Sequence, residues 1–479
     1  MEEPFPEDNN KKKYKILNIK NILILSNIIL IVIAIELYFV ISDGKIKNQN
    51  INDENIITNR KIIFQQPEEN APAKYILVHI PEKEIFMSTL HPAASLYEDV
   101  TDYLKVKECF DNLKKILKDK NIELITVRSA LKLNKTALKK LAFNALKYEI
   151  DNETKIETNI PEHKIFMDYV KNEYKQEVID KLSDDQLVDV ILNNPKYILS
   201  PTKLNTFIEP KSISFNPLGN LIFCRDQQIT TKKGVVIGRA RSSQRDGEHI
   251  IMKQVFENLN STILGTVTKE YDENAYLEGG DFYVAKPDLS MLGVGLRTTI
   301  KGAEYLMKND FLDTRYMAII YDGEDKDQQR MHLDTYFNIL SEDYVIVLDF
   351  DDVQKYYPNK KIGRKVYLYD NEAISSIKSD NNNISKIIGK YKLINIYNNF
   401  YKFLEERLKY KIIKVTHQQQ IDYMINFLNI GNNEILSVNN ELKIKAKKSK
   451  TNIINLEFKP ILNMYGAMHC ITQVSRSDK

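Results

Sequence analysis

The chain has 479 residues, enough for one large catalytic domain with an insertion or for two to three ordinary domains. Hydrophobic residues make up 43% of it and charged residues 28%, which are values of a globular protein. The 68 basic and 65 acidic residues leave a net charge of +3, so the composition implies no nucleic acid or other polyanion as a partner. The three cysteines, Cys109, Cys224 and Cys470, exclude an even-numbered disulfide framework and a paired-cysteine metal motif.

The N-terminal region carries the one candidate membrane segment of the sequence. Residues 22–41 form an apolar run that reaches the roughly 20 residues of a bilayer crossing. Five lysines precede it in residues 1–21, so the positive-inside tendency predicts a cytoplasmic N-terminus. A cleaved secretory signal is the alternative, but its apolar region is normally about 7 to 15 residues long. We therefore expect an uncleaved transmembrane anchor in a single-pass membrane protein, followed by a polar linker over residues 42–73; the side of the membrane that holds the remainder stays open.

The rest of the chain alternates strand-like and helix-like patterns. Short β-branched runs such as KYILVHI, NLIFC, GVVIG and YVIVLD are separated by amphipathic stretches such as EHIIMKQVFENL. This alternation predicts an α/β domain over residues 74–479. Residues 102–205 are richer in helical patterns and predict a helical insertion into that domain.

Four separated clusters carry reactive side chains at or just after a strand-like run. They are NPLGNLIFCRD, which ends in Asp226; LEGGD, with Glu278 and Asp281; MHLDTYF, with His332 and Asp334; and GAMHCIT, with Cys470. Each cluster alone has an ordinary structural explanation, such as a surface ion pair, a plain turn, a structural histidine or a buried thiol. His332 and Asp334 are two residues apart and would share one face of an extended strand.

Together the clusters suit one reaction, the attack on a guanidinium carbon. A guanidinium is a planar cation that carboxylates bind in bidentate fashion, and Asp226, Glu278 and Asp334 supply such acceptors. Its central carbon is a poor electrophile, so the reaction needs a soft nucleophile and an acid for the departing nitrogen, and Cys470 and His332 have those capacities. Because the same carboxylates would raise the pKa of the Cys470 thiol, we expect the bound cation to help ionise it.

At these strings the chain resembles the arginine deiminases of the guanidino-group-modifying enzyme superfamily, over roughly residues 74–479. The resemblance implies a pseudo-fivefold α/β propeller with the helical insertion, and hydrolysis of L-arginine to L-citrulline and ammonia through a covalent Cys470 thiouronium. Asp226 and Asp334 would then clamp the guanidinium, while Glu278 and His332 would handle protons. The resemblance implies no metal and no cofactor, and it suggests a homo-oligomer.

The resemblance also implies a set of residues that bind the substrate: Asn220, Phe223, Arg245, Asp281 and Arg297. Two positions depart from the family pattern. Asp246 follows Arg245 where the family has a basic stretch, and Tyr465 stands where well-known members have an arginine directed at the α-carboxylate. A tyrosine hydroxyl carries no charge, so recognition of a free α-carboxylate is less firmly predicted than the chemistry.

Two alternatives therefore stay open. The first keeps the chemistry and changes the substrate to peptidyl-arginine, agmatine or a methylated arginine. The second is an inactive, membrane-tethered binding protein, since a fold alone does not establish a function. A cysteine-histidine protease fits less well, because nothing beside Cys470 resembles a protease nucleophile string and clustered carboxylates have no role there.

Overall fold

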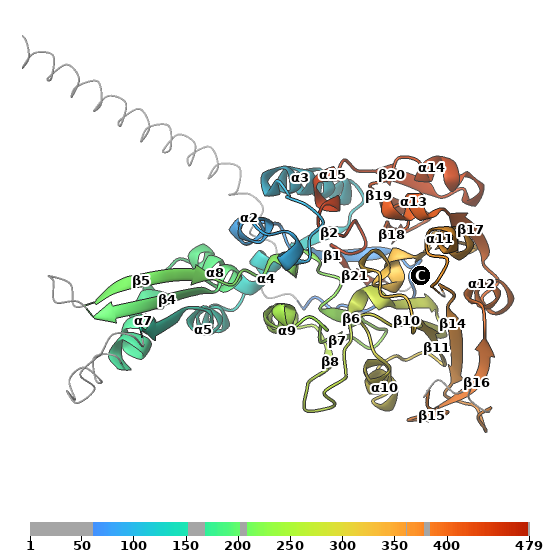
Figure 1. Cartoon of the computed structure of the whole chain (residues 1–479), viewed down its shortest axis with the longest axis horizontal. Coiled ribbons are helices and arrows are strands. Elements are labelled where there is room, and N and C mark those ends of the chain that lie inside the picture. Colours follow the sequence, from blue (N-terminus) through green and yellow to red (C-terminus); the bar gives the residue numbers. More distant parts are fainter. Residues whose placement is uncertain (1–60, 152–167, 202–207, 361, 378–383, 478–479) are drawn as a thin grey trace, which may run out of the picture. The chain divides into compact units, whose positions relative to one another are not determined.

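The computed structural model describes residues 61–151, 168–201, 208–360, 362–377 and 384–477 (Figure 1). One local pattern recurs in every sheet of these residues. A central strand pairs antiparallel with one neighbour and parallel with the other. β-branched and aliphatic side chains fill these short strands, and most of them are buried, as in Val235–Ile237 and Leu289–Val294.

Five of the sheets have three strands each. In spatial order they are β2 (Glu123–Thr126), β1 (Ala73–Val78) and β21 (Gln473–Arg476); β6 (Gln228–Thr230), β7 (Val235–Ile237) and β8 (Ile263–Thr266); β12 (Phe337–Ile339), β13 (Tyr344–Leu348) and β17 (Lys411–Val415); β18 (Leu428–Gly431), β19 (Glu434–Ser437) and β20 (Asn452–Asn455); and β3 (Lys147–Ile150), β4 (Pro195–Pro201) and β5 (Ile208–Phe215).

The sixth sheet has six strands. It contains the same three-stranded pattern in β9 (Phe282–Lys286), β10 (Leu289–Val294) and β11 (Tyr316–Tyr321), and it continues through β14 (Lys365–Asp370), β16 (Tyr391–Tyr397) and β15 (Ile387–Ile388). The added strands pair antiparallel with β11 and with one another.

Several helices begin where a side chain accepts hydrogen bonds from their free N–H groups. Asp102 caps α3, and Ser183 with Gln186 forms a capping box at α8. The helices are α2 (Lys83–Thr89), α3 (Tyr103–Asp119), α4 (Val127–Lys132), α5 (Lys135–Ala145), α7 (Lys175–Lys181), α8 (Asp184–Asn193), α9 (Asp246–Asn258), α10 (Ile300–Lys308), α11 (Phe350–Tyr356), α12 (Phe400–Lys402), α13 (His417–Ile421), α14 (Leu442–Lys445) and α15 (Lys459–Leu462).

The predicted fold class is corrected in two respects within the described residues. Six sheets carry the three-stranded pattern, not five, and they do not close into one barrel. The additional sheet, β3-β4-β5, lies largely in the region that we expected to be helical, because residues 195–201 pair with 208–215 to form the green ribbon of Figure 1. β2 also falls in that region and pairs with β1. The alternation of polar and apolar residues in these strands is short, and the longer helical periodicity of α3 and α8 dominates the pattern of the region.

The prediction of a transmembrane anchor, and with it of a single-pass membrane protein, is also corrected. Among the helices that the structure describes, none combines the length and apolar character needed to cross a bilayer. The expected span at residues 22–41 itself lies outside the described residues.

The segment 61–73 is packed against the strands, although we expected it to belong to a polar linker. Ile62 and Phe64 are fully buried. Backbone N–H groups of this segment donate to distant carbonyls, as from Ile62 to Leu259 and from Glu69 to Val284. Residues 60–479 form one compact unit by their contacts, so this segment is part of the body that carries the candidate site.

Candidate active site

The segment that ends in Asp226 folds as a turn and not as the expected strand. Residues Gly219–Ile222 form a 3-10 helix whose side chains are all buried, and Asp226 follows it in a loop. Its neighbour Arg225 donates its backbone N–H to the carbonyl of Cys470 at 3.1 Å. The first and last clusters of the sequence are therefore joined directly, 245 positions apart.

The two glycines of LEGGD are needed for close approach. A Cβ on Gly279 would lie 2.0 Å from the carbonyl oxygen of Arg225, and one on Gly280 would lie 2.7 Å from Nδ1 of His332. Gly279 also donates its N–H to the carbonyl of Asp226 at 3.0 Å. The glycines thus allow the Glu278 segment to pack between the Asp226 loop and the His332 ring.

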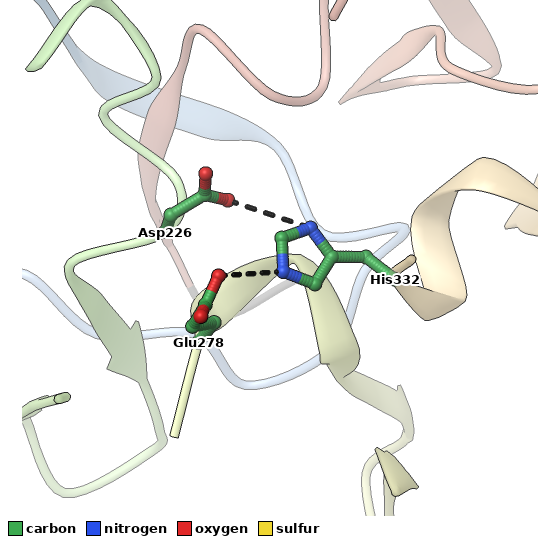
Figure 2. Close-up of side chains that lie close together, drawn as sticks. All are labelled: Asp226, Glu278 and His332. Atoms are coloured by element: carbon green, nitrogen blue, oxygen red, sulfur yellow. Dashed lines mark hydrogen bonds and ion pairs between the residues drawn. The ribbon is translucent and has the colours of Figure 1, made fainter. Parts of the chain in front are cut away.

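His332 lies between two carboxylates (Figure 2). Its Nε2 is 2.9 Å from Oε2 of Glu278, and its Nδ1 is 3.8 Å from Oδ1 of Asp226. Burial opposes protonation of the ring, but Asp226, Glu278 and Asp281 outweigh it and raise the pKa of His332 to about 9. The imidazolium in turn holds the pKa of Glu278 well below its usual value, against the effect of burial. At neutral pH the pair is an imidazolium with a carboxylate.

Arg245 is enclosed by acceptors. Its Nη1 is 2.8 Å from Oδ2 of Asp226, its Nε donates to Oε2 of Glu248 at 2.9 Å, and its Nη2 donates to the carbonyl of Asn220 at 3.1 Å. Its Nη1 is also 4.0 Å from Oε2 of Glu278. Burial opposes the charge, yet these carboxylates raise the pKa of Arg245 above its usual value. The side chain therefore holds Asp226 in place.

The nucleophile candidate has its own set of contacts. The Cys470 sulfur lies 3.6 Å from Oδ2 of Asp334, and the same oxygen is 2.7 Å from Nδ1 of His469. Burial first, then Asp334 and Asp226, raise the pKa of the Cys470 thiol well above its usual value. Burial opposes ionisation of Asp334, but the hydrogen bond with His469 and the charges of His332 and Arg225 outweigh it and lower the pKa of Asp334. Asp334 is therefore an anion beside a neutral thiol.

His332 and Asp334 do not share a face of a strand as expected. Residues Leu333–Thr335 form a 3-10 turn, so His332 contacts Glu278 while Asp334 contacts His469 and Cys470. The two carboxylates of the predicted clamp, Asp226 and Asp334, are consequently divided between two groups of contacts. Both raise the pKa of Cys470, which places both within electrostatic range of its sulfur.

At the site, two buried carboxylate oxygens of the described residues have no hydrogen-bond donor. They are Oδ1 of Asp226 and Oδ1 of Asp334, and Nδ1 of His332 also has no partner there. A buried acceptor without a donor is rare in proteins and costs about 1–3 kcal/mol. Each of the two carboxylates therefore has one oxygen fixed by the protein and one oxygen that a ligand with N–H groups would satisfy.

A pocket that is open to solvent has Cys470 in its lining. Its polar lining includes the side chains of Glu98, Gln328, Gln420 and Tyr465, and among the described residues that line it there is no lysine or arginine. Tyr465 has a φ of +62°, in the left-handed region that favours glycine. The pocket wall thus offers amide and hydroxyl groups and one carboxylate.

The remaining predicted site residues surround these groups. The side chain of Asn220 donates to the carbonyl of Ser95 at 2.9 Å. The Phe223 ring packs on the loop before the nucleophile, where a Cβ on Gly466 would lie 2.3 Å from it. Arg297 is 8% exposed and donates to Oε1 of the pocket residue Gln328 at 3.0 Å.

Asp281 binds backbone groups. One of its oxygens accepts from the N–H of Leu333 at 2.9 Å, and the other accepts from the N–H of Thr298 at 3.3 Å. Burial raises the pKa of Asp281 to about 7, against the opposing effect of His332 and these hydrogen bonds. Because Leu333 follows His332 and Thr298 follows Arg297, Asp281 fixes the backbone beside two predicted site residues.

Asp226, Glu278 and His332 could hold a metal ion, since one ligand atom from each lies within 4.8 Å of the others. The same donor set suits an organic cation. Arg245 already places a guanidinium nitrogen 2.8 Å from Asp226 and 4.0 Å from Glu278. The expectation that no metal is needed remains a prediction.

Two residues at the site were not identified from the sequence. Glu248 binds Arg245 three residues away, a spacing that predicts contact on a helix and could have been noticed in RDGE. Asn426 donates to the sulfur of Cys470 at 3.1 Å. It lies in MINFL, which contains no reactive pattern, so no local signal could have identified it.

Comparison with known protein families matches residues 94–476 to the arginine deiminase family. The chain belongs to the arginine deiminase family. The resemblance predicted from the four clusters is therefore confirmed, and it extends over most of the chain.

Individual arginine deiminases are distant relatives. That of Limosilactobacillus fermentum is 27% identical over 281 residues, covering 57% of this chain and 66% of the relative. That of Staphylococcus epidermidis is 28% identical over 290 residues, covering 58% and 67%. The matched segments thus span about two thirds of the length of these relatives. Among solved structures, the substrate-bound N-terminal domain of an arginine dihydrolase from cyanobacteria is 15% identical with a TM-score of 0.47, covering 84% of this chain and 97% of that domain.

Proposed function

We propose that this arginine deiminase family member hydrolyses L-arginine to L-citrulline and ammonia. One observation carries the proposal: Oδ1 of Asp226 and Oδ1 of Asp334 are buried without a donor, and both carboxylates raise the pKa of the Cys470 thiol. A guanidinium presents five N–H donors in a plane and one positive charge, so it satisfies both oxygens at once. Bound in this way, its central carbon faces a thiol.

The guanidinium also changes the charge that the thiol experiences. Burial and the charges of Asp334 and Asp226 keep the Cys470 thiol protonated in the resting protein. A bound cation offsets those two charges and so favours the thiolate, which is the reactive form. Binding of the substrate therefore prepares the nucleophile.

The reaction then proceeds in two steps. The Cys470 thiolate attacks the guanidinium carbon, His332 as an imidazolium gives its proton to the departing nitrogen, and ammonia leaves as the carbon–nitrogen bond breaks. A thiouronium remains on the sulfur. The neutral His332 then takes a proton from water, and the resulting hydroxide adds to the same carbon. The carbon–sulfur bond breaks as the hydroxyl proton passes to the departing sulfur, which releases citrulline and restores the Cys470 thiol. The pKa of about 9 gives His332 the proton that the first step requires.

The other residues hold these groups and the substrate. Glu278 orients His332 through the 2.9 Å contact, and Arg245 holds Asp226 through the 2.8 Å contact. In this proposal Phe223 contacts the aliphatic chain of the substrate and Arg297 binds its α-carboxylate. Asn220 and Asp281 hold the backbone segments that carry these two residues.

The test is the release of citrulline and ammonia from arginine by the purified full chain. Cys470→Ser keeps the size of the side chain and removes the soft nucleophile, so it should abolish turnover while the thermal unfolding temperature stays close to that of the wild type. Mass spectrometry of a rapidly quenched reaction should detect a covalent adduct on Cys470 in the wild type alone. A folded wild-type protein that releases no citrulline would refute the proposal.

A second candidate keeps the chemistry and changes the rest of the substrate. The described lining of the pocket has one carboxylate, Glu98, and no cationic side chain, and it includes Tyr465, which precedes Cys470 in the same segment of the chain. This favours a guanidino compound without a free carboxylate, such as agmatine, a methylated arginine or peptidyl-arginine. Comparing kcat/KM across these substrates and free arginine decides between the candidates, and a strong preference for free arginine excludes the second.

We also propose a homo-oligomer, on the family resemblance alone. Analytical ultracentrifugation of the purified chain tests it, and sedimentation as a monomer at the concentration of the activity assay contradicts it.

A further inference from the structure

Asn426 lies between α13 and β18 and is 3% exposed. Its side-chain amide makes four contacts with the segments that carry Cys470 and Asp334. Oδ1 accepts from the N–H groups of Ala467 at 3.2 Å and Cys470 at 3.3 Å, and Nδ2 donates to the carbonyl of Asp334 at 3.2 Å and to Sγ of Cys470 at 3.1 Å. The hydrogen-bonding capacity of the amide is therefore fully used.

The orientation of this amide is fixed without reference to the sulfur. The two backbone N–H groups can only donate, so the atom that faces them is the oxygen. The carbonyl of Asp334 can only accept, so the atom that faces it is the nitrogen. The second N–H of the amide is then directed at Sγ of Cys470. Rotating the amide by half a turn would break all three of these contacts with backbone groups.

We propose that Asn426 is a positioning residue for the nucleophile, which holds the Cys470 loop against the Asp334 turn and donates a hydrogen bond that favours the thiolate. The inference rests on the proposed role of Cys470. An N–H donor next to sulfur stabilises the thiolate more than the thiol, because the ionised sulfur is the stronger acceptor. The backbone carbonyl of Asn426 also accepts from the N–H of His469 at 3.4 Å, so Asn426 contacts Ala467, His469 and Cys470 in the loop.

This donor matters because burial and both nearby carboxylates act in the opposite direction, and only hydrogen bonds from the Ala467 backbone and from Asn426 lower the pKa of the Cys470 thiol among its main described influences. Asp334 at 3.6 Å and Asp226 both disfavour the thiolate. His469 is bound to Asp334, and burial lowers its pKa, so it brings no charge. The tyrosines that act on the sulfur, Tyr283 and Tyr423, are neutral because burial raises their pKa values. In the described residues, the side-chain donor to the sulfur is Asn426.

A matched control is available in Asn338. This asparagine on β12 is fully buried and donates to the carbonyls of Ile425 and Phe427, both at 2.8 Å. It therefore supports the residues on either side of Asn426 and has no contact with Cys470. Its removal reproduces the loss of a buried amide in the same segment without the loss of the donor at the sulfur.

The experiment measures the alkylation rate of Cys470 by iodoacetamide in the full chain, as a function of pH, by mass spectrometry of the peptide that contains it. In Asn426→Ala the rate at a given pH below the thiol pKa should fall about tenfold or more, the effect of removing a hydrogen bond to a charged group. With arginine as the substrate, kcat should fall more than KM rises. Asn338→Ala should keep the wild-type alkylation profile.

Asn426→Asp is the second variant. It retains an acceptor for the N–H groups of Ala467 and Cys470, so the loop keeps its contacts even where Asn426→Ala does not fold, and it replaces the donor by an acceptor. Its alkylation rate should fall at least as far as that of Asn426→Ala.

Two results overturn the inference: a folded Asn426 variant with the wild-type alkylation profile, or an equal loss in Asn338→Ala. Because alkylation needs no turnover, failure of the proposed function is distinguishable. A wild-type protein whose Cys470 alkylation depends on Asn426 but which releases no citrulline refutes the function and keeps the inference.

Discussion

Gly280→Ala should disable the site by displacing the His332 ring while leaving the fold intact. A Cβ at this position would lie 2.7 Å from Nδ1 and 2.9 Å from Cγ of His332, whereas ordinary contact begins at 3.4 Å. The ring must therefore retreat by about 0.7 Å, the difference between these two distances. Such a movement lengthens the 2.9 Å contact between His332 and Glu278 and misplaces the proton donor. A misplacement of about 1 Å costs on the order of 100-fold in rate, so we expect kcat to fall about 10- to 100-fold.

The assay is citrulline release under saturating arginine, with the unfolding temperature measured in parallel. Gly363→Ala is the matched control, since a Cβ there meets nothing within 4 Å and the residue has no positive φ. It should retain wild-type kcat. The reasoning about His332 is refuted if Gly280→Ala folds and turns over arginine at the wild-type rate, or if Gly363→Ala loses activity to the same extent.

Four further predictions follow from the buried charges and from the lining of the pocket. Activity should fall as pH rises through about 9, because His332 then loses the proton that it donates, and a pH profile of kcat checks this. The ion pairs of His332 should stabilise the fold fully below its ordinary pKa of 6.5, and this stability should be lost as pH rises to about 9, which urea unfolding at several pH values measures. Arg245→Met should destabilise the protein by about 3–5 kcal/mol in urea unfolding, and Arg245→Met with Glu248→Gln should recover part of the loss. Asp281→Asn should cost about 1–3 kcal/mol in the same measurement, because an amide keeps one acceptor oxygen of the two. Tyr465→Arg should raise the ratio of kcat/KM for arginine to kcat/KM for agmatine about tenfold, because an arginine can form a charged hydrogen bond to the α-carboxylate that agmatine lacks. Measuring kcat/KM for both substrates checks this.

The sequence predicted most strands that are continuous apolar runs. KYILVHI, GVVIG and YVIVLD coincide with β1, β7 and β13, since short β-branched segments between turns have few alternatives. NLIFC has the same composition but forms a 3-10 turn, because its side chains are buried by distant parts of the chain. Local composition predicts burial well and the backbone conformation of a short buried segment poorly.

The candidate site was predictable to the extent that its residues stand in recognisable strings. The four clusters led to the arginine deiminase family, and the structure brings their residues into two adjoining groups of contacts. What the strings could not give is the partner of each residue. Asp281 was expected to bind substrate and instead accepts from two backbone N–H groups. Asn426 stands in no string, because its importance comes from contacts across 44 positions of sequence.

The division of the carboxylates explains how one site binds a cation and still contains a resting thiol. Asp226 is held by Arg245 and faces His332, whereas Asp334 is held by His469 and faces Cys470. Each carboxylate thus has a fixed oxygen for orientation and a second oxygen that awaits a donor. In the resting protein burial, together with the charges of both carboxylates, keeps the thiol protonated and therefore slow to react with oxidants. A guanidinium that binds both carboxylates offsets their charges and so favours the thiolate when its own carbon lies beside the sulfur. Selectivity for a planar cation and activation of the nucleophile therefore have the same physical cause.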